Sequence, residues 1–195
     1  MRQHSAFLAF ALSATLATGL EAQGPMRAMP SGRATTEVTL THVDSAARVN
    51  AQPAAIRIDY GQPHLRGRTL HTDSLVPYDQ PWRTGANEPT TLTTDVELVV
   101  GGATIPKGRY VLETLPTRTG WTLLVQREPA PATTPAATAG PATEVARIAL
   151  RQSASPVPLE SLTFWLIPSR EPGVQRGELR LAWGTVVLAT DWSVR

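Results

Sequence analysis

Arginine, asparagine and glutamate lie close together in one short stretch of this chain, and together they could bind a polar ligand. The stretch reads Trp82-Arg-Thr-Gly-Ala-Asn-Glu-Pro. Arg83 offers a planar guanidinium that suits a carboxylate or a phosphate, and Asn87 offers both a hydrogen-bond donor and an acceptor. Pro89 favours an extended backbone at Glu88, so this carboxylate should lead stiffly into the next strand. We therefore expect a site for an anionic or hydroxyl-bearing group here.

Tyrosines and further charged residues precede this stretch within the interval 59–91, which is longer than most loops of a compact domain. Their rings could supply contact area, and their charged groups could hold polar atoms of the same ligand. The ligand would be small and polar or carbohydrate-like, or else a component of the cell envelope. The predicted ligand-binding residues are Asp59, Tyr60, Arg68, Tyr78, Trp82, Arg83, Asn87 and Glu88.

Two other interpretations of the same residues remain open. A hydrolase would use Asp59 and Glu88 as acid and base, which requires both carboxylates to face one cleft about 5–10 Å apart. A purely structural envelope module would pair Arg83 with Glu88 or Asp59 and would use Trp82 as a plug at the end of the core. The chain has no Gly-x-Ser-x-Gly nucleophile motif and no paired-histidine zinc motif. Binding without catalysis is therefore the leading hypothesis, and no catalytic residue is predicted.

Histidines in the same interval raise the question of a metal site. His64 and His71 could ligate a metal ion together with Asp73 or Asp59. Their spacing matches no known ligand motif, and solvent-facing loop side chains explain them more simply. The chain also has no cysteine, which excludes thiolate ligands and thiol nucleophiles. We predict no metal site and no cofactor.

The start of the chain indicates an exported protein. An almost unbroken apolar run at 6–20 follows a short polar start, and Ala22 ends it with a small residue. This is the layout of a secretory signal peptide covering 1–22. The run is too short for a membrane span, and no second run of spanning length follows. We expect a protein of the periplasm or the medium, in an unknown oligomeric state.

The charge pattern does not favour a nucleic-acid partner. The formal net charge is +2, and nearly all the basic residues are arginines scattered singly along the chain. Nucleic-acid binders usually cluster such residues on one face.

Apolar and polar residues alternate almost throughout, and this period of two predicts β-strands. We expect a flexible lead-in at 23–33, one β domain over 34–195, and within it a loop rich in Pro, Ala and Thr at 128–143. About nine short strands between Gly and Pro signals favour an all-β antiparallel sandwich or a jelly-roll-like barrel. The predicted strands cover 38–43, 56–60, 92–100, 110–115, 121–126, 145–150, 162–167, 179–183 and 186–194.

Several short motifs resemble the secreted bacterial domain-of-unknown-function family 2911. The resemblance covers roughly 33–126 and returns weakly at Leu162-Thr-Phe. It implies a secreted or periplasmic β-rich domain and implies no reaction. The motifs are Ile56-Arg-Ile-Asp-Tyr-Gly-Gln-Pro, Gly67-Arg, Leu75-Val-Pro-Tyr, Trp82-Arg-Thr-Gly-Ala-Asn-Glu, Ile105-Pro-Lys-Gly-Arg-Tyr and Trp121-Thr.

Overall fold

A computed structural model describes residues 26–44, 49, 51–72, 74–128, 143–173 and 175–195. The predicted signal peptide and most of the predicted Pro/Ala/Thr loop lie outside these residues. No helix in the described part is long and apolar enough to cross a membrane.

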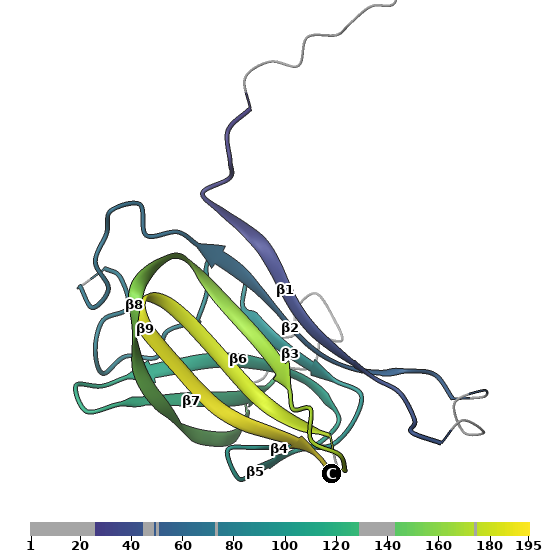
Figure 1. Cartoon of the computed structure of the whole chain (residues 1–195). Coiled ribbons are helices and arrows are strands. Elements are labelled where there is room, and N and C mark those ends of the chain that lie inside the picture. The colour runs from purple at the N-terminus through teal and green to yellow at the C-terminus, as the bar shows by residue number, and fades with distance from the viewer. Residues whose placement is uncertain (1–25, 45–48, 50, 73, 129–142, 174) are drawn as a thin grey trace, which may run out of the picture.

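Within the described residues, nine strands form one antiparallel sheet (Figure 1), so the predicted all-β antiparallel class is confirmed. The order in the sheet is β1-β2-β3-β6-β7-β8-β9-β4-β5, and the sheet is not closed into a barrel. The strands are β1 (Ser31–Leu40), β2 (Ala54–Pro63), β3 (Thr90–Thr94), β4 (Leu98–Val100), β5 (Ala103–Ile105), β6 (Gly108–Pro116), β7 (Trp121–Arg127), β8 (Thr143–Pro168) and β9 (Arg176–Val194).

The prediction of a single strand over 92–100 is wrong. The chain forms β3 and β4 there, and β3 pairs with β2 and β6 while β4 pairs with β9 and β5. Asp95 stabilises the bend between them, because its amide donates to the Ala55 carbonyl and its carboxylate accepts from the Ala55 amide, both at 3.0 Å. Apolar alternation continues across this bend, so the period of two does not reveal it.

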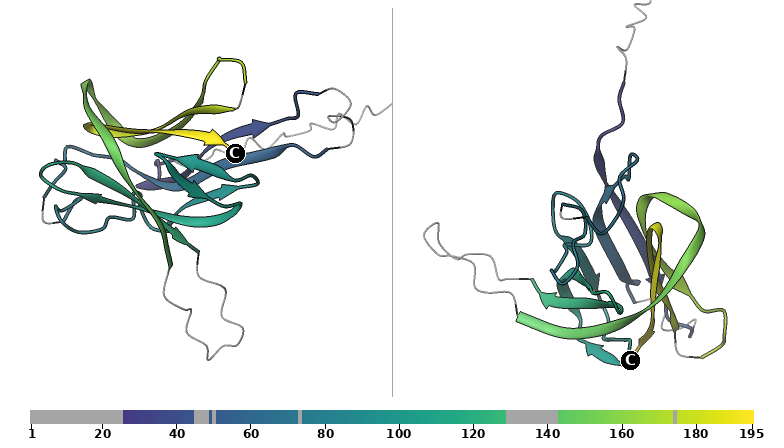
Figure 2. Two further views of the ribbon diagram at one scale, coloured as in Figure 1. Left: turned by 90° about the horizontal axis from the view of Figure 1, so that it is seen from below. Right: turned by 90° about the vertical axis from the view of Figure 1, so that its left-hand side faces the viewer.

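β8 and β9 are far longer than predicted and form one hairpin that folds back on itself. Their pairing shifts register around Pro156 and Pro158, and β9 turns at Gly184, which has a φ of 60°. The amide of Val194 donates to the carbonyl of Gln175, so the two ends of β9 meet (Figure 2). Each strand therefore joins two predicted ones: 145–150 with 162–167, and 179–183 with 186–194.

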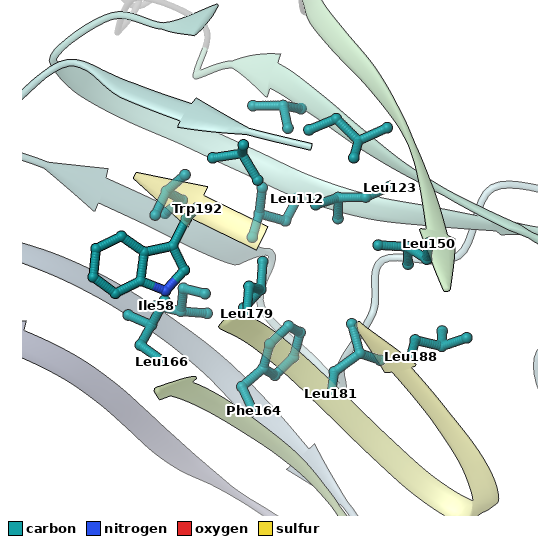
Figure 3. Close-up of a cluster of buried hydrophobic side chains, with 14 of the residues drawn as sticks. Ile58, Leu112, Leu123, Leu150, Phe164, Leu166, Leu179, Leu181, Leu188 and Trp192 are labelled. Carbon is teal, nitrogen blue, oxygen red and sulfur yellow. The ribbon is translucent and has the colours of Figure 1, made fainter. Parts of the chain in front are cut away.

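One hydrophobic core lies between the facing parts of the bent sheet (Figure 3). Phe164, Trp183 and Trp192 are each at most 3% exposed, whereas Trp165, on the opposite face of β8 from Phe164, is half-buried. Full burial of each large apolar side chain contributes about 2 kcal/mol. The side chains labelled in Figure 3 come from β2, β6, β7, β8 and β9.

The second half of β8 lies across the inner face of β1 and β2. Side chains of these two strands, and not a further strand, form hydrogen bonds with its backbone there. The Phe164 amide donates to the Tyr60 hydroxyl at 3.2 Å, and the Leu166 amide donates to Thr36 Oγ1 at 3.3 Å. Gln62 Nε2 donates to the Leu162 carbonyl at 3.0 Å. Buried backbone groups at the free edge of β8 are satisfied in this way.

Candidate functional site

The loop 64–89 joins β2 to β3 and carries most of the predicted site residues. Within the described part of the chain, every non-glycine residue with a positive φ lies in this loop. For a β-branched residue such as Val76 or Thr84, this conformation costs about 1–2 kcal/mol. Strain of this kind persists only where the surroundings fix the backbone, and it clusters at functional sites. The six residues are Arg66, His71, Val76, Asp79, Thr84 and Asn87.

Three buried threonines fix the end of the loop next to β3. Thr84 is fully buried, and its Oγ1 lies 3.0 Å from both the Trp82 carbonyl oxygen and the Thr114 hydroxyl. The hydroxyl of Thr90 donates to the Thr84 carbonyl at 2.9 Å. These bonds hold the strained backbone at Thr84 against β6, which contains Thr114.

Two glycines allow the loop backbone to touch β2. A Cβ atom at Gly61 would lie 1.8 Å from the Ala86 carbonyl oxygen, and one at Gly85 would lie 2.7 Å from Thr90 Oγ1. The Ala86 amide donates to the Gly61 carbonyl at 3.2 Å. The two motifs that contain these glycines, 56–63 and 82–88, are thus packed together through their backbones.

Of the predicted aromatic residues, Tyr60 belongs to the core and Trp82 packs against it. Tyr60 is 3% exposed, and its ring centroid lies 4.8 Å from that of Phe164. Burial raises the pKa of Tyr60. Trp82 is half-buried and stacks on Trp183 at 5.7 Å between ring centroids, and it exchanges backbone hydrogen bonds with Thr114 at 2.7 and 2.8 Å. Neither ring is fully open to a ligand from solvent.

Asp59 points to the outer face of β2, where basic neighbours hold it. Its carboxylate accepts hydrogen bonds from Arg33 Nε at 2.9 Å, from Arg57 Nη2 at 3.0 Å and from the Thr35 hydroxyl at 2.9 Å. Desolvation raises the pKa of Asp59, but the hydrogen bonds from Arg33, Arg57 and Thr35 together outweigh it and lower the pKa to about 2. Asp59 is therefore ionised and already paired.

Tyr78 and Arg68 lie elsewhere on the loop and also have partners. Tyr78 stacks on His71 at 4.2 Å, and the Arg118 guanidinium lies 5.1 Å from the centre of the Tyr78 ring. Arg68 donates to the Leu65 and His64 carbonyls at 3.0 and 2.7 Å.

Arg83, Asn87 and Glu88 are exposed and lie together beside the start of β1. Arg83 Nη1 donates to the Asn87 carbonyl at 2.6 Å, and Asn87 Nδ2 reaches the Ser31 carbonyl at 3.4 Å. The Glu88 carboxylate makes no hydrogen bond or ion pair with any residue that the structure describes. The structure thus joins Arg83 to Asn87, with Glu88 exposed next to Asn87 in the chain, whereas the other five predicted residues are distributed over β2 and the rest of the loop.

Two hollows of the described surface are lined by residues other than the exposed trio. One of about 260 Å³ lies between the loop and the bend of the β8–β9 hairpin, and Arg68 and His71 line it. A groove of about 720 Å³ lies between the two ends of β9, with Arg176, Glu178 and Trp192 among its lining residues. Among the described residues, no group of three His, Asp or Glu side chains could hold a metal ion.

The sequence did not predict that β1 contacts two of the predicted site residues. Ser31 lies in the predicted lead-in but begins β1 and accepts the bond from Asn87, and Arg33 neutralises Asp59. Both contacts depend on the long-range pairing of β1 with β2, for which the local sequence gives no signal.

Comparison with known proteins assigns a family without an activity. No curated protein and no solved structure matches the chain. The model of a family described as "Protein of unknown function (DUF2911)" matches residues 43–191. The match covers well over half of the chain, including the loop 64–89. The chain therefore belongs to the DUF2911 family.

Proposed function

We propose that this protein is an exported, non-catalytic binding domain that takes a small polar or carbohydrate-like ligand, or an envelope component with such groups, at Arg83, Asn87 and Glu88. The observation that carries the proposal is the exposure of these three polar side chains on a loop whose backbone is strained and fixed.

The three side chains offer complementary chemistry. Among the described residues, only one guanidinium nitrogen of Arg83 makes a hydrogen bond, so the remaining N–H groups can meet a carboxylate, a phosphate or a sugar hydroxyl. Asn87 uses its amide nitrogen on Ser31 and keeps its side-chain oxygen as an acceptor. Glu88 can accept from a hydroxyl or an amine.

Rigidity of the loop favours binding by these groups. The buried threonines and the contact of Gly61 with Ala86 fix the backbone before any ligand arrives. A site that is ordered in advance loses less conformational entropy on binding. The exposure of the trio on this fixed loop favours binding over a purely structural role, which would not need these side chains to face solvent.

The alternative of a hydrolase is less well supported. A two-carboxylate mechanism needs one carboxyl group with a raised pKa that can donate a proton. The pKa of Asp59 is lowered to about 2 by its partners, and this carboxylate is occupied by Arg33 and Arg57.

A thermal-shift screen of sugars and small anions tests the proposal on the protein and on Arg83→Ala. A ligand at a hundredfold excess over its Kd should raise the Tm by about 5 °C or more. The shift should disappear in Arg83→Ala and persist in Arg170→Ala, which removes an exposed arginine with no partner among the described residues. A stabilising ligand that survives Arg83→Ala would contradict the proposal.

A further inference from the structure

The outer edge of β1 has no partner strand among the described residues. β1 is the first strand in the sheet order, and it pairs with β2 along all ten of its residues without a bulge (Figure 1). In an antiparallel strand, alternate residues direct their N–H and C=O groups to the outer edge, where they can pair with another strand. The strand at the other margin, β5, has only three residues.

β1 also lacks the features by which edge strands usually avoid pairing. Its sequence, Ser-Gly-Arg-Ala-Thr-Thr-Glu-Val-Thr-Leu, has no proline and no lysine and is rich in threonine. Its two charged residues have opposite signs, so β1 carries no net charge that would repel an incoming strand. Arg33 pairs with Asp59, and Glu37 lies 3.8 Å from Arg57.

The charges of β1 are complementary to those of an antiparallel copy of the same strand. If Thr35 faces Thr35 of a second copy, Arg33 faces Glu37 of that copy, and Glu37 faces its Arg33. Opposite charges directly across an antiparallel pair stabilise it. A two-fold axis at Arg33 or at Glu37 would place like charges opposite each other, so the charges select the register centred on Thr35.

The other residues of β1 also fit the register centred on Thr35. All pairs from Ser31 with Thr39 to Thr39 with Ser31 then lie within β1. On the inner face, Gly32 would meet Val38 and Ala34 would meet Thr36, so a small side chain faces a larger one at each position. On the outer face, Glu37 would lie between Arg57 of its own chain and Arg33 of the second copy.

We propose that β1 is an interaction surface for a second copy of this chain. The two β1 strands pair antiparallel about a two-fold axis at Thr35 and join the two sheets into one. Such an isologous contact closes on itself and gives a dimer, not a fibre.

Disulfide trapping tests this register directly, because the chain has no cysteine. In the proposed dimer the Cα atoms of two Thr35 residues lie about 4.5–5.5 Å apart, which suits a disulfide. The matched control is Thr39→Cys, on the same face of β1, because its two copies would lie about 26 Å apart. Under mild oxidation Thr35→Cys should form covalent dimers at least about tenfold faster than Thr39→Cys, because pairing raises the effective concentration of its thiols. Equal rates would overturn the proposal.

A charge reversal supplies a second test that needs no oxidation. Glu37→Arg would face Arg33 of the second copy and should raise the dimer dissociation constant, measured by sedimentation velocity, at least about tenfold. The control Glu144→Arg makes the same charge change on β8 and should leave the constant unchanged. A protein that stays monomeric at all concentrations, or a dimer that Glu37→Arg does not weaken, would contradict pairing through β1.

Discussion

At the scale of single residues, different environments give different roles to Asp59 and Glu88, two carboxylates of the interval 59–91. Asp59 on β2 is held by Arg33 and Arg57, whereas Glu88 is exposed and makes no bond with a described residue. The sequence places both acids in the same interval but does not reveal that β1 brings Arg33 to Asp59. The first acid therefore stabilises the sheet, and the second remains available to a ligand.

Asp59→Asn should destabilise the protein in a pH-dependent way. The pKa of Asp59 is about 2 in the folded protein, below its ordinary value of 3.8. Its contribution is therefore present above the ordinary value and is lost as the pH falls from 3.8 through about 2. We expect the substitution to lower the free energy of unfolding by about 1 kcal/mol at pH 7, after allowance for solvent screening, and by less at pH 2.5. Urea unfolding of both proteins at the two pH values measures this, and an equal loss at both would contradict it.

Gly61→Ala should loosen the loop from β2. The added Cβ would lie 1.8 Å from the Ala86 carbonyl oxygen, and backbone cannot move aside as a flexible side chain can. We expect a loss of about 3 kcal/mol in the free energy of unfolding. Gly120→Ala is the matched control, since its Cβ would meet no atom within 4 Å. Chemical unfolding of the two variants should differ clearly, and similar stabilities would show that the contact at Gly61 is not restrictive.

At the scale of elements, the period of two predicts where strands occur but not where they break or join. The strand at 121–126 is observed with nearly these bounds, as β7, because a plain alternation is sufficient there. The alternation over 92–100 also looked continuous, yet Asp95 bonds to Ala55 and bends the chain. Conversely, β8 continues through Pro156 and Pro158 because the hairpin folds back at that point. Contacts distant in sequence decide the bend at Asp95 and the course of β8.

Tyr60→Phe should weaken the attachment of β8 to β2. Without the Tyr60 hydroxyl, the buried amide of Phe164 loses its acceptor, which costs about 1–2 kcal/mol. The control is Tyr78→Phe, because the Tyr78 hydroxyl makes no hydrogen bond with a described residue. Hydrogen exchange of the Phe164 amide should become at least about tenfold faster in Tyr60→Phe only. Unchanged protection of this amide would show that the second half of β8 does not depend on the bond.

At the scale of the whole molecule, the groove between the ends of β9 and the exposed trio on the loop lie in different places. The groove of about 720 Å³ lies between the ends of β9, and its lining residues Glu178 and Asp191 both accept hydrogen bonds from Arg151. The exposed trio of Arg83, Asn87 and Glu88 lies on the loop between β2 and β3. The sequence could group Arg83, Asn87 and Glu88 as one candidate site because they are neighbours in the chain. It could not predict the groove, which depends on the folded β8–β9 hairpin.

We propose that the exposed trio, and not the groove, binds the ligand. Backbone amide NMR during titration with a ligand from the thermal-shift screen tests it most directly. We predict that the largest chemical-shift changes fall at Arg83 to Glu88 and at Ser31, whose carbonyl Asn87 contacts. Changes centred on Arg176, Glu178 and Asp191, with Arg83 to Glu88 unaffected, would contradict the claim and would place the site in the groove between the ends of β9.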